Sequence, residues 1–85
     1  MNDEQLAIFL LLSLHADGEI GCSEARLLQR AIAEGWPRLT LPELQVTLRE
    51  LANSGWVLSW KPKLAGWRWK LAEQGVLVLR EKNLA

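Results

Sequence analysis

The strongest constraint in the sequence is a change of periodicity at Asn53-Ser54-Gly55. Before this point, leucines recur at the spacing of one helix face; after it, large apolar residues alternate with other residues, which is the period of a strand. The turn-forming sequence "KPKLAG" divides the alternating stretch in two, so residues 56–60 and 67–71 are predicted to form a β-hairpin. Any fold of this chain therefore has to let a helix run directly into a hairpin.

The two helices before the hairpin have clear start signals. Ser23 is a good N-cap for a helix that ends at Gly35, where a C′ glycine belongs. Thr40 caps the next helix, and Glu43 follows three residues later. The leucines of this third helix of the chain share one face. The opposite face shows Pro42, Val46, Arg49 and Asn53, with Gln45 at its margin.

Weaker signals place the remaining elements. An apolar run over residues 6–16 predicts a first helix with Asn2 as its N-cap. Because this helix is apolar nearly all round, we expect it to be central or to lie at a subunit interface. Residues 72–83 predict a last helix, in which Gly75 is unfavourable, and residues 19–22 could form a brief strand.

The hairpin is predicted to bury one face against the helices. Pairing of Trp60 with Trp67 would place large apolar side chains opposite one another along this face, with Arg68 and Lys70 on the other. Trp56 and Trp69 would then cover the core, whereas Trp60 and Trp67 lie nearer the tip and are candidates for a binding or dimer interface. The predicted inner face consists of Trp56, Leu58, Trp60, Trp67, Trp69 and Leu71. Trp36 is expected to pack beside the end of the second helix.

Length and composition limit the class of protein. A chain of 85 residues is expected to form one domain, residues 1–85. With one cysteine, Cys22, it can form neither an internal disulfide nor a cysteine-based zinc site, which suits the cytoplasm. No apolar run approaches the length of a membrane span, and the start lacks the basic region of a signal peptide. There is no glycine-rich phosphate loop and no metal-ligand cluster, and Cys22 has no histidine nearby, so neither an enzyme nor a cofactor is predicted.

The charges are unevenly distributed although the net charge is zero. Residues 1–35 carry a net charge of −4 and residues 36–85 carry +4. The positive charge is concentrated around the hairpin turn, and such a local patch can steer a polyanion even on a neutral protein. The alternative is that these side chains form an ordinary solvated surface. The residues concerned are Lys61, Lys63, Arg68 and Lys70.

The order helix, short strand, helix, helix, hairpin, helix resembles the winged helix-turn-helix superfamily. The stretch "LTLPELQVTLRELANSGWV" (39–57) is similar to a recognition helix that leads into the wing, and "WKLAEQGVLVL" (69–79) is similar to the junction of the wing with a last helix. The resemblance covers nearly the whole chain. It implies an α+β fold, namely a small winged-helix domain with a three-helix core, a two-stranded β-hairpin wing and a C-terminal helix.

The resemblance also implies a function. In that superfamily the recognition helix enters the major groove and the wing lies along the backbone, so the expected partner is double-stranded DNA and the expected role is sequence-specific transcriptional regulation. Base-edge contacts would come from Gln45, Val46, Arg49 and Asn53. Phosphate contacts would come from Arg38, Lys61, Lys63, Arg68 and Lys70. Short regulators of this kind usually bind as dimers, here through the first or the last helix.

A second hypothesis belongs to another class of function. The same fold is widely used as a protein-interaction module, and fold alone does not fix function. In that case the outermost apolar residue of the third helix, Val46, and the hairpin residues Trp60 and Trp67 would bind a protein partner, so that the chain recruits or inhibits a larger assembly. From its size alone, such a chain would suit a phage or mobile element.

Overall fold

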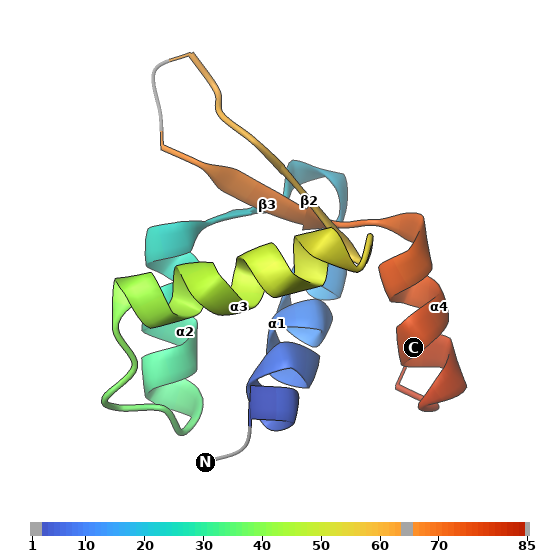
Figure 1. The fold of residues 1–85 in the computed structure, drawn as a ribbon, viewed down its shortest axis with the longest axis horizontal. Coiled ribbons are helices and arrows are strands. Elements are labelled where there is room, and N and C mark those ends of the chain that lie inside the picture. The colour runs from blue at the N-terminus through green and yellow to red at the C-terminus, as the bar shows by residue number, and fades with distance from the viewer. Residues whose placement is uncertain (1–2, 64–65, 85) are drawn as a thin grey trace.

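The computed structural model describes residues 3–63 and 66–84, so the predicted cap at Asn2 and part of the predicted 61–66 turn lie outside the described residues. Four helices and a three-stranded antiparallel sheet make an α+β fold, in which the hairpin projects above the helices and α3 crosses in front of them (Figure 1). The elements are α1 (Asp3–Asp17), the 3-10 turn η1 (Gly18–Ile20), β1 (Cys22–Ser23), α2 (Glu24–Glu34), α3 (Leu41–Asn53), β2 (Val57–Trp60), β3 (Arg68–Leu71) and α4 (Glu73–Glu81).

The helix starts predicted from capping residues are confirmed. The Ser23 hydroxyl accepts a hydrogen bond from the backbone N–H of Arg26 at 3.3 Å, at the start of α2. Thr40 and Glu43 form a reciprocal capping box at the start of α3: the Glu43 N–H donates to the Thr40 hydroxyl at 3.4 Å, and the Thr40 N–H donates to the Glu43 carboxylate at 3.1 Å. These bonds satisfy backbone donors that have no partner within the helix.

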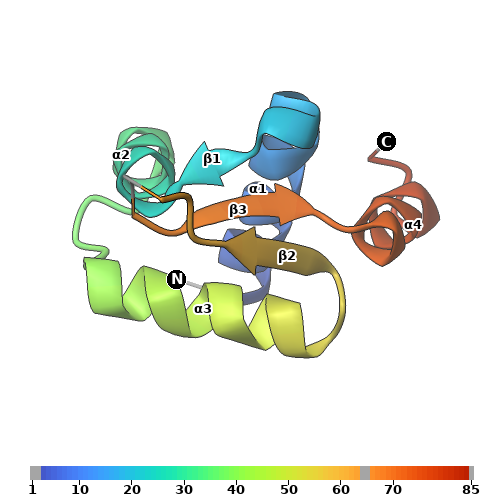
Figure 2. The ribbon, with the colours of Figure 1, turned by 90° about the horizontal axis from the view of Figure 1, so that it is seen from above.

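The sheet has the order β1-β3-β2, so β3 is its central strand (Figure 2). Cys22 of β1 pairs with Trp69 of β3, which joins the start of α2 to the hairpin. The brief strand predicted over residues 19–22 is therefore only partly right, because residues 18–20 form the 3-10 turn and the strand begins at Cys22.

The predicted hairpin register is wrong by one residue. Trp60 lies opposite Arg68 and not Trp67, and Ser59 lies opposite Trp69. A shift of one residue turns every side chain of β2 to the other face. Val57 is thus the inward residue, 1% exposed, and Leu58 points outward, 51% exposed.

The physical reason for this register is the short connection from α3. The Trp56 N–H donates to the carbonyl of Leu51 at 3.0 Å, and the Trp56 carbonyl accepts from the Ala72 N–H at 2.9 Å. These two bonds hold Trp56 between the helix end and the strand, so β2 begins at Val57. Val57 then enters the core, and Trp56 packs against that core from the side.

The core is built mainly from leucines of α1 and α3. Trp69 is buried in it and Trp56 packs on it, which confirms the expectation that these two tryptophans cover the core. Trp36 packs against Phe9 with a ring separation of 5.3 Å, as predicted for a residue beside the end of α2. The fully buried leucines are Leu10, Leu11, Leu14, Leu27, Leu44, Leu48 and Leu79. Among the helices of the described residues, the central α1 included, none is long and apolar enough to cross a membrane.

Replacing Gly75 with alanine is expected to destabilise the protein, although alanine is the better helix former. A Cβ at this position would collide with the Trp56 carbonyl oxygen and would lie 2.6 Å from Leu71 Cδ1. We expect the free energy of unfolding to fall by about 1–3 kcal/mol, as for other overpacked sites. Urea denaturation tests this, with the exposed Arg80→Ala on the same helix as a control. An unchanged Gly75→Ala midpoint would show that α4 can move away from β3.

Candidate functional site

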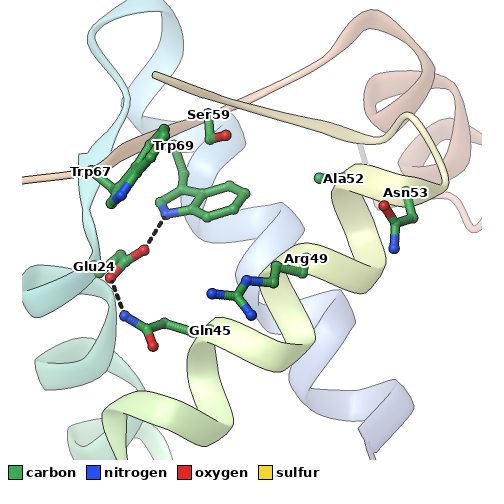
Figure 3. Close-up of a pocket in the computed structure, with 8 residues that line it drawn as sticks. All are labelled: Glu24, Gln45, Arg49, Ala52, Asn53, Ser59, Trp67 and Trp69. Atoms are coloured by element: carbon green, nitrogen blue, oxygen red, sulfur yellow. Dashed lines mark hydrogen bonds between the residues drawn. The ribbon is translucent and has the colours of Figure 1, made fainter. Parts of the chain in front are cut away.

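A cleft of about 330 Å³ lies between α3 and the hairpin. Polar side chains of α3 line one side of the cleft. The indoles of Trp69, in β3, and of Trp67, directly before β3, line the other side, as Figure 3 shows. Several residues that the sequence singled out for separate reasons meet here. The lining residues are Glu24, Gln45, Arg49, Ala52, Asn53, Ser59, Trp67 and Trp69.

One face of α3 supplies the polar side of the cleft. Gln45, Arg49 and Asn53 are four residues apart, so they lie one above another on the helix. The leucines on the other side of the helix are buried, which fixes this face toward the cleft and solvent. The Arg49 guanidinium is exposed and has no hydrogen-bond or ion-pair partner among the described residues. It is therefore available to an anion.

Glu24 connects three elements at the bottom of the cleft. One carboxylate oxygen accepts a hydrogen bond from Gln45 Nε2 of α3 at 2.8 Å, and the other accepts from Trp69 Nε1 of β3 at 3.0 Å (Figure 3). Both hydrogen bonds are part-buried. Because their acceptor is a charged carboxylate, they are stronger than hydrogen bonds between neutral groups. Glu24 thereby fixes the orientation of the Gln45 side-chain amide. The carbonyl oxygen of that amide makes no bond to Glu24.

Sequence reasoning missed Glu24. Glu24 contributes there only to the net charge of residues 1–35, and nothing local links it to residues 45 and 69. The available signal was the alternation of strand residues, which places the indole of Trp69 on the inner face. A buried indole N–H usually has a hydrogen-bond acceptor, so an acceptor for the Trp69 N–H could have been expected.

The hairpin side of the cleft is aromatic. Trp69 is 5% exposed and is held by Glu24, whereas Trp67, which precedes β3, is 47% exposed. Ser59, opposite Trp69 in the ladder, adds a hydroxyl to the same wall. The cleft therefore has one fixed indole and one that presents much of its surface to solvent.

The cations proposed for phosphate contacts fall into two groups. Arg38, Lys61 and Lys63 are exposed and have no hydrogen-bond or ion-pair partner within residues 3–63 and 66–84. Arg68 is part-buried, and its Nη2 donates to the carbonyls of Ile20 and Gly21, each at 3.2 Å. The guanidinium of Arg68, the first member of the second group, is thus already hydrogen-bonded within the protein.

Lys70 is the other member of the second group. Its Nζ lies 3.1 Å from the Glu19 carboxylate and 6.0 Å from the ring centre of Trp60. The Glu19 side chain is almost fully exposed, so this ion pair contributes little to stability. A competing anion could therefore replace Glu19 at low cost.

The residues proposed for a protein interface do not form one surface. Val46 is exposed and borders a shallow hollow on the other side of α3, together with Leu39 and Thr47. Trp67 lies in the cleft, and Trp60 is on the outer face of the hairpin, half-buried over Lys70. The structure adds two apolar residues that the sequence did not indicate, Leu58 and Ile20, both exposed.

Other reactive side chains lie outside this site. Cys22 is buried in the core, and burial raises the pKa of its thiol above the usual value. His15 is exposed near the end of α1. Within the described part of the chain, His, Cys, Asp and Glu side chains do not gather in threes that could hold a metal ion.

Comparisons of the chain with protein-family models, with curated proteins and with solved structures find no match. The chemistry of the site therefore has to be judged from its own groups. A cleft with a free guanidinium, two amide side chains, a hydroxyl and an accessible indole can bind a planar group and an anion together. The one carboxylate among the lining residues, that of Glu24, already accepts two hydrogen bonds.

Proposed function

We propose that this chain is a winged-helix protein that binds double-stranded DNA as a sequence-specific regulator, with α3 in the major groove and the β2–β3 hairpin as the wing. The element order and the sheet order β1-β3-β2 support this proposal. The observation that carries it is the position of Gln45, Arg49 and Asn53 on one face of α3, directly beside a hairpin whose turn carries Lys61 and Lys63, neither of which has a partner among the described residues. The helix proposed to read bases thus lies beside the hairpin whose turn lysines are proposed to contact phosphates.

Base recognition would depend chiefly on α3. Arg49 is free to donate two hydrogen bonds to a guanine, and Asn53 can pair with adenine. The choice of bases that Gln45 can contact is restricted, because its Nε2 already donates a hydrogen bond to Glu24. Gln45 would present its carbonyl oxygen, which accepts from an adenine or cytosine amino group. Val46 is exposed and can contact a thymine methyl.

Phosphate contacts would come mainly from Lys61, Lys63 and Arg38. Arg68 and Lys70 have partners inside the protein, so their contribution requires exchange of Glu19 or of backbone carbonyls. The exposed carboxylates Glu43 and Glu50 of α3 oppose a polyanion. We therefore expect a modest non-specific affinity with a shallow salt dependence, since each phosphate contact adds about one unit to the slope of log K against log salt.

The double variant Lys61→Gln/Lys63→Gln is expected to weaken DNA binding equally on all sequences. The slope of log K against log salt should fall by about 1 for each lysine that contacts a phosphate. The measurement is fluorescence anisotropy of the purified protein with random duplex DNA at several salt concentrations. Arg80→Gln/Lys82→Gln is the matched control, because it removes the same charge at the C-terminal end of α4, where Lys82 directly follows the helix and pairs with Glu4, at the other end of the molecule from the hairpin turn (Figure 1).

Equal losses in the two double variants would show that net charge matters and the wing does not. No binding by the wild-type protein at low salt would remove the DNA proposal altogether, because non-specific affinity needs only charge.

A protein-interaction module is the second candidate, and one observation favours it. Exposed Leu58 and half-buried Trp60 line a hollow on the outer face of the hairpin, and exposed apolar clusters mark interfaces. In that case the lysine variants would behave as wild type, and Leu58→Asp would abolish partner binding. For a homodimer, α4 offers more apolar surface than α1, because Leu77 is 50% exposed and four leucines of α1 are buried.

A further inference from the structure

We propose that the cleft between α3 and the hairpin holds one unpaired nucleotide, so that the protein prefers DNA with an unstacked base over a perfect duplex. The cleft and its chemistry stand independently of the proposed function; that the nucleotide belongs to a DNA strand rests on it. No element of the fold is required to move, because the cleft is open in the structure.

The first argument is the accessible indole. Trp67 lines the cleft yet keeps nearly half of its surface exposed, which is unusual for a tryptophan in a domain with a buried core. The face of an indole is a stacking platform for any base, and such stacking changes affinity by roughly tenfold or more per base. A base inside a duplex is covered by its neighbours, so only an unstacked base can use this platform.

The second argument is the set of unused polar groups opposite the indole. Arg49 has no partner in the described chain, and it lies on the helix wall that faces Trp67 across the cleft (Figure 3). A guanidinium binds a phosphate with two parallel hydrogen bonds. Asn53 and the Gln45 carbonyl oxygen can bond to the edge of a base, which in an unpaired nucleotide is free on its Watson–Crick side.

The third argument is the rigidity of the floor. Glu24 accepts hydrogen bonds from both Gln45 and Trp69, which fixes two of the side chains that line the cleft. A volume of about 330 Å³ is at the lower end for small-molecule sites, which suits one nucleotide and not a longer segment. A preformed site also avoids the cost of ordering its side chains on binding.

The charge of the surface explains why such a site would matter. Four cations proposed for DNA contacts, Arg38, Arg49, Lys61 and Lys63, have no internal partner among the described residues and are spread over the turn, the start of α3 and its outer face, and Glu43 and Glu50 oppose them. Backbone contacts alone therefore give a duplex limited affinity. Stacking of one base in the cleft adds a contribution that does not depend on salt.

The experiment compares three fluorescently labelled DNAs of one sequence: a perfect duplex, the same duplex with a single-base bulge, and the single strand. Anisotropy titrations give the ratio of affinities for the bulged and perfect duplexes, which we expect to be about tenfold for the wild-type protein. Trp67→Ala should reduce this ratio to about one, and Trp67→Phe should retain most of it because phenylalanine still stacks. Arg49→Gln should lower it, whereas Arg80→Gln on α4 should not.

A second measurement uses free deoxynucleoside monophosphates as probes. Two-dimensional amide and indole NMR spectra of the wild-type protein should shift at Trp67, Ser59 and Arg49, and the shifts should disappear in Trp67→Ala. The same spectra report whether each variant is folded. Trp67 is 47% exposed and lies outside the buried core, so its replacement is expected to leave the fold intact.

The outcomes separate the two proposals. Equal affinity for bulged and perfect duplex overturns the inference and leaves DNA binding intact. A preference that persists in Trp67→Ala and Arg49→Gln also overturns it, because bulged DNA then binds through its easier bending. Nucleotide shifts in the cleft without any DNA binding would support the site and overturn the proposed function. Absence of both would overturn both.

Discussion

Replacing Gly21 with alanine is expected to lower the free energy of unfolding by about 3 kcal/mol or more. Gly21 has φ 70° and ψ −162°, a region that residues with a Cβ rarely adopt. A Cβ there would also collide with the carbonyl oxygen of Trp69 in the central strand and lie 2.8 Å from Trp60 Cη2. Backbone strain and collision thus act together at the pairing of β1 with β3.

Gly18→Ala is the matched control for this variant. Gly18 also has a positive φ, 63°, but a Cβ would meet nothing within 4 Å. This control measures backbone strain alone, which we expect to cost about 1–2 kcal/mol. Urea denaturation followed by tryptophan fluorescence gives both values. If the two variants were equally stable, the contact of Gly21 with the central strand would have no energetic role.

Replacing Leu48 with alanine is expected to lower the free energy of unfolding by about 2–5 kcal/mol. Leu48 is fully buried on the inner face of α3, so the shortened side chain leaves a cavity between this helix and the rest of the core. An 85-residue domain has a total stability of roughly 4–13 kcal/mol, so one such loss is a large part of it. Thermal and urea denaturation test this expectation.

The control for Leu48→Ala is Leu77→Ala on α4, because Leu77 is half exposed and its truncation should change the stability by less than about 0.5 kcal/mol. Leu48 does not line the cleft. If the proposed DNA-binding function holds, Leu48→Ala should therefore bind DNA with wild-type affinity at a temperature where it is folded. A loss of binding in the folded variant would show that α3 moves when its core contact is removed.

Elements fixed by local chemistry could be predicted from the sequence. The capping box at Thr40 and Glu43, the Ser23 cap and the break at Gly35 each depend on neighbours within a few residues, and all three were correct. The hairpin was found for the same reason, because its alternation is read within each strand. Local patterns of this kind do not require knowledge of the rest of the fold.

The register of the hairpin could not be predicted, and the reason lies in β2. Apolar residues occupy both of its faces, with Val57 on one and Leu58 and Trp60 on the other. Alternation therefore does not say which face is inward. Residue size suggested the face with tryptophan, but the decision is made by the hydrogen bonds of Trp56 to Leu51 and Ala72, which are properties of the folded chain.

The same distinction holds for the candidate site. The face of α3 that carries Gln45, Arg49 and Asn53 follows from helix geometry, and the structure places these three side chains together in one cleft, as the helix projection indicated. The contacts of Arg68 with η1 and of Glu24 with Trp69 span more than 40 residues. Such contacts depend on the tertiary fold, so composition and spacing gave no indication of them.

The central position of β3 has a consequence for the order in which the chain is made. Cys22 and Trp69 pair across 47 positions, so the first strand has no partner until the third has been synthesised. At a translation rate of about 5–20 residues per second, the two are separated by roughly 2–10 s. During that interval α1 and α2 exist without the sheet that covers them, and nascent-chain folding can finish only after β3 has left the ribosome.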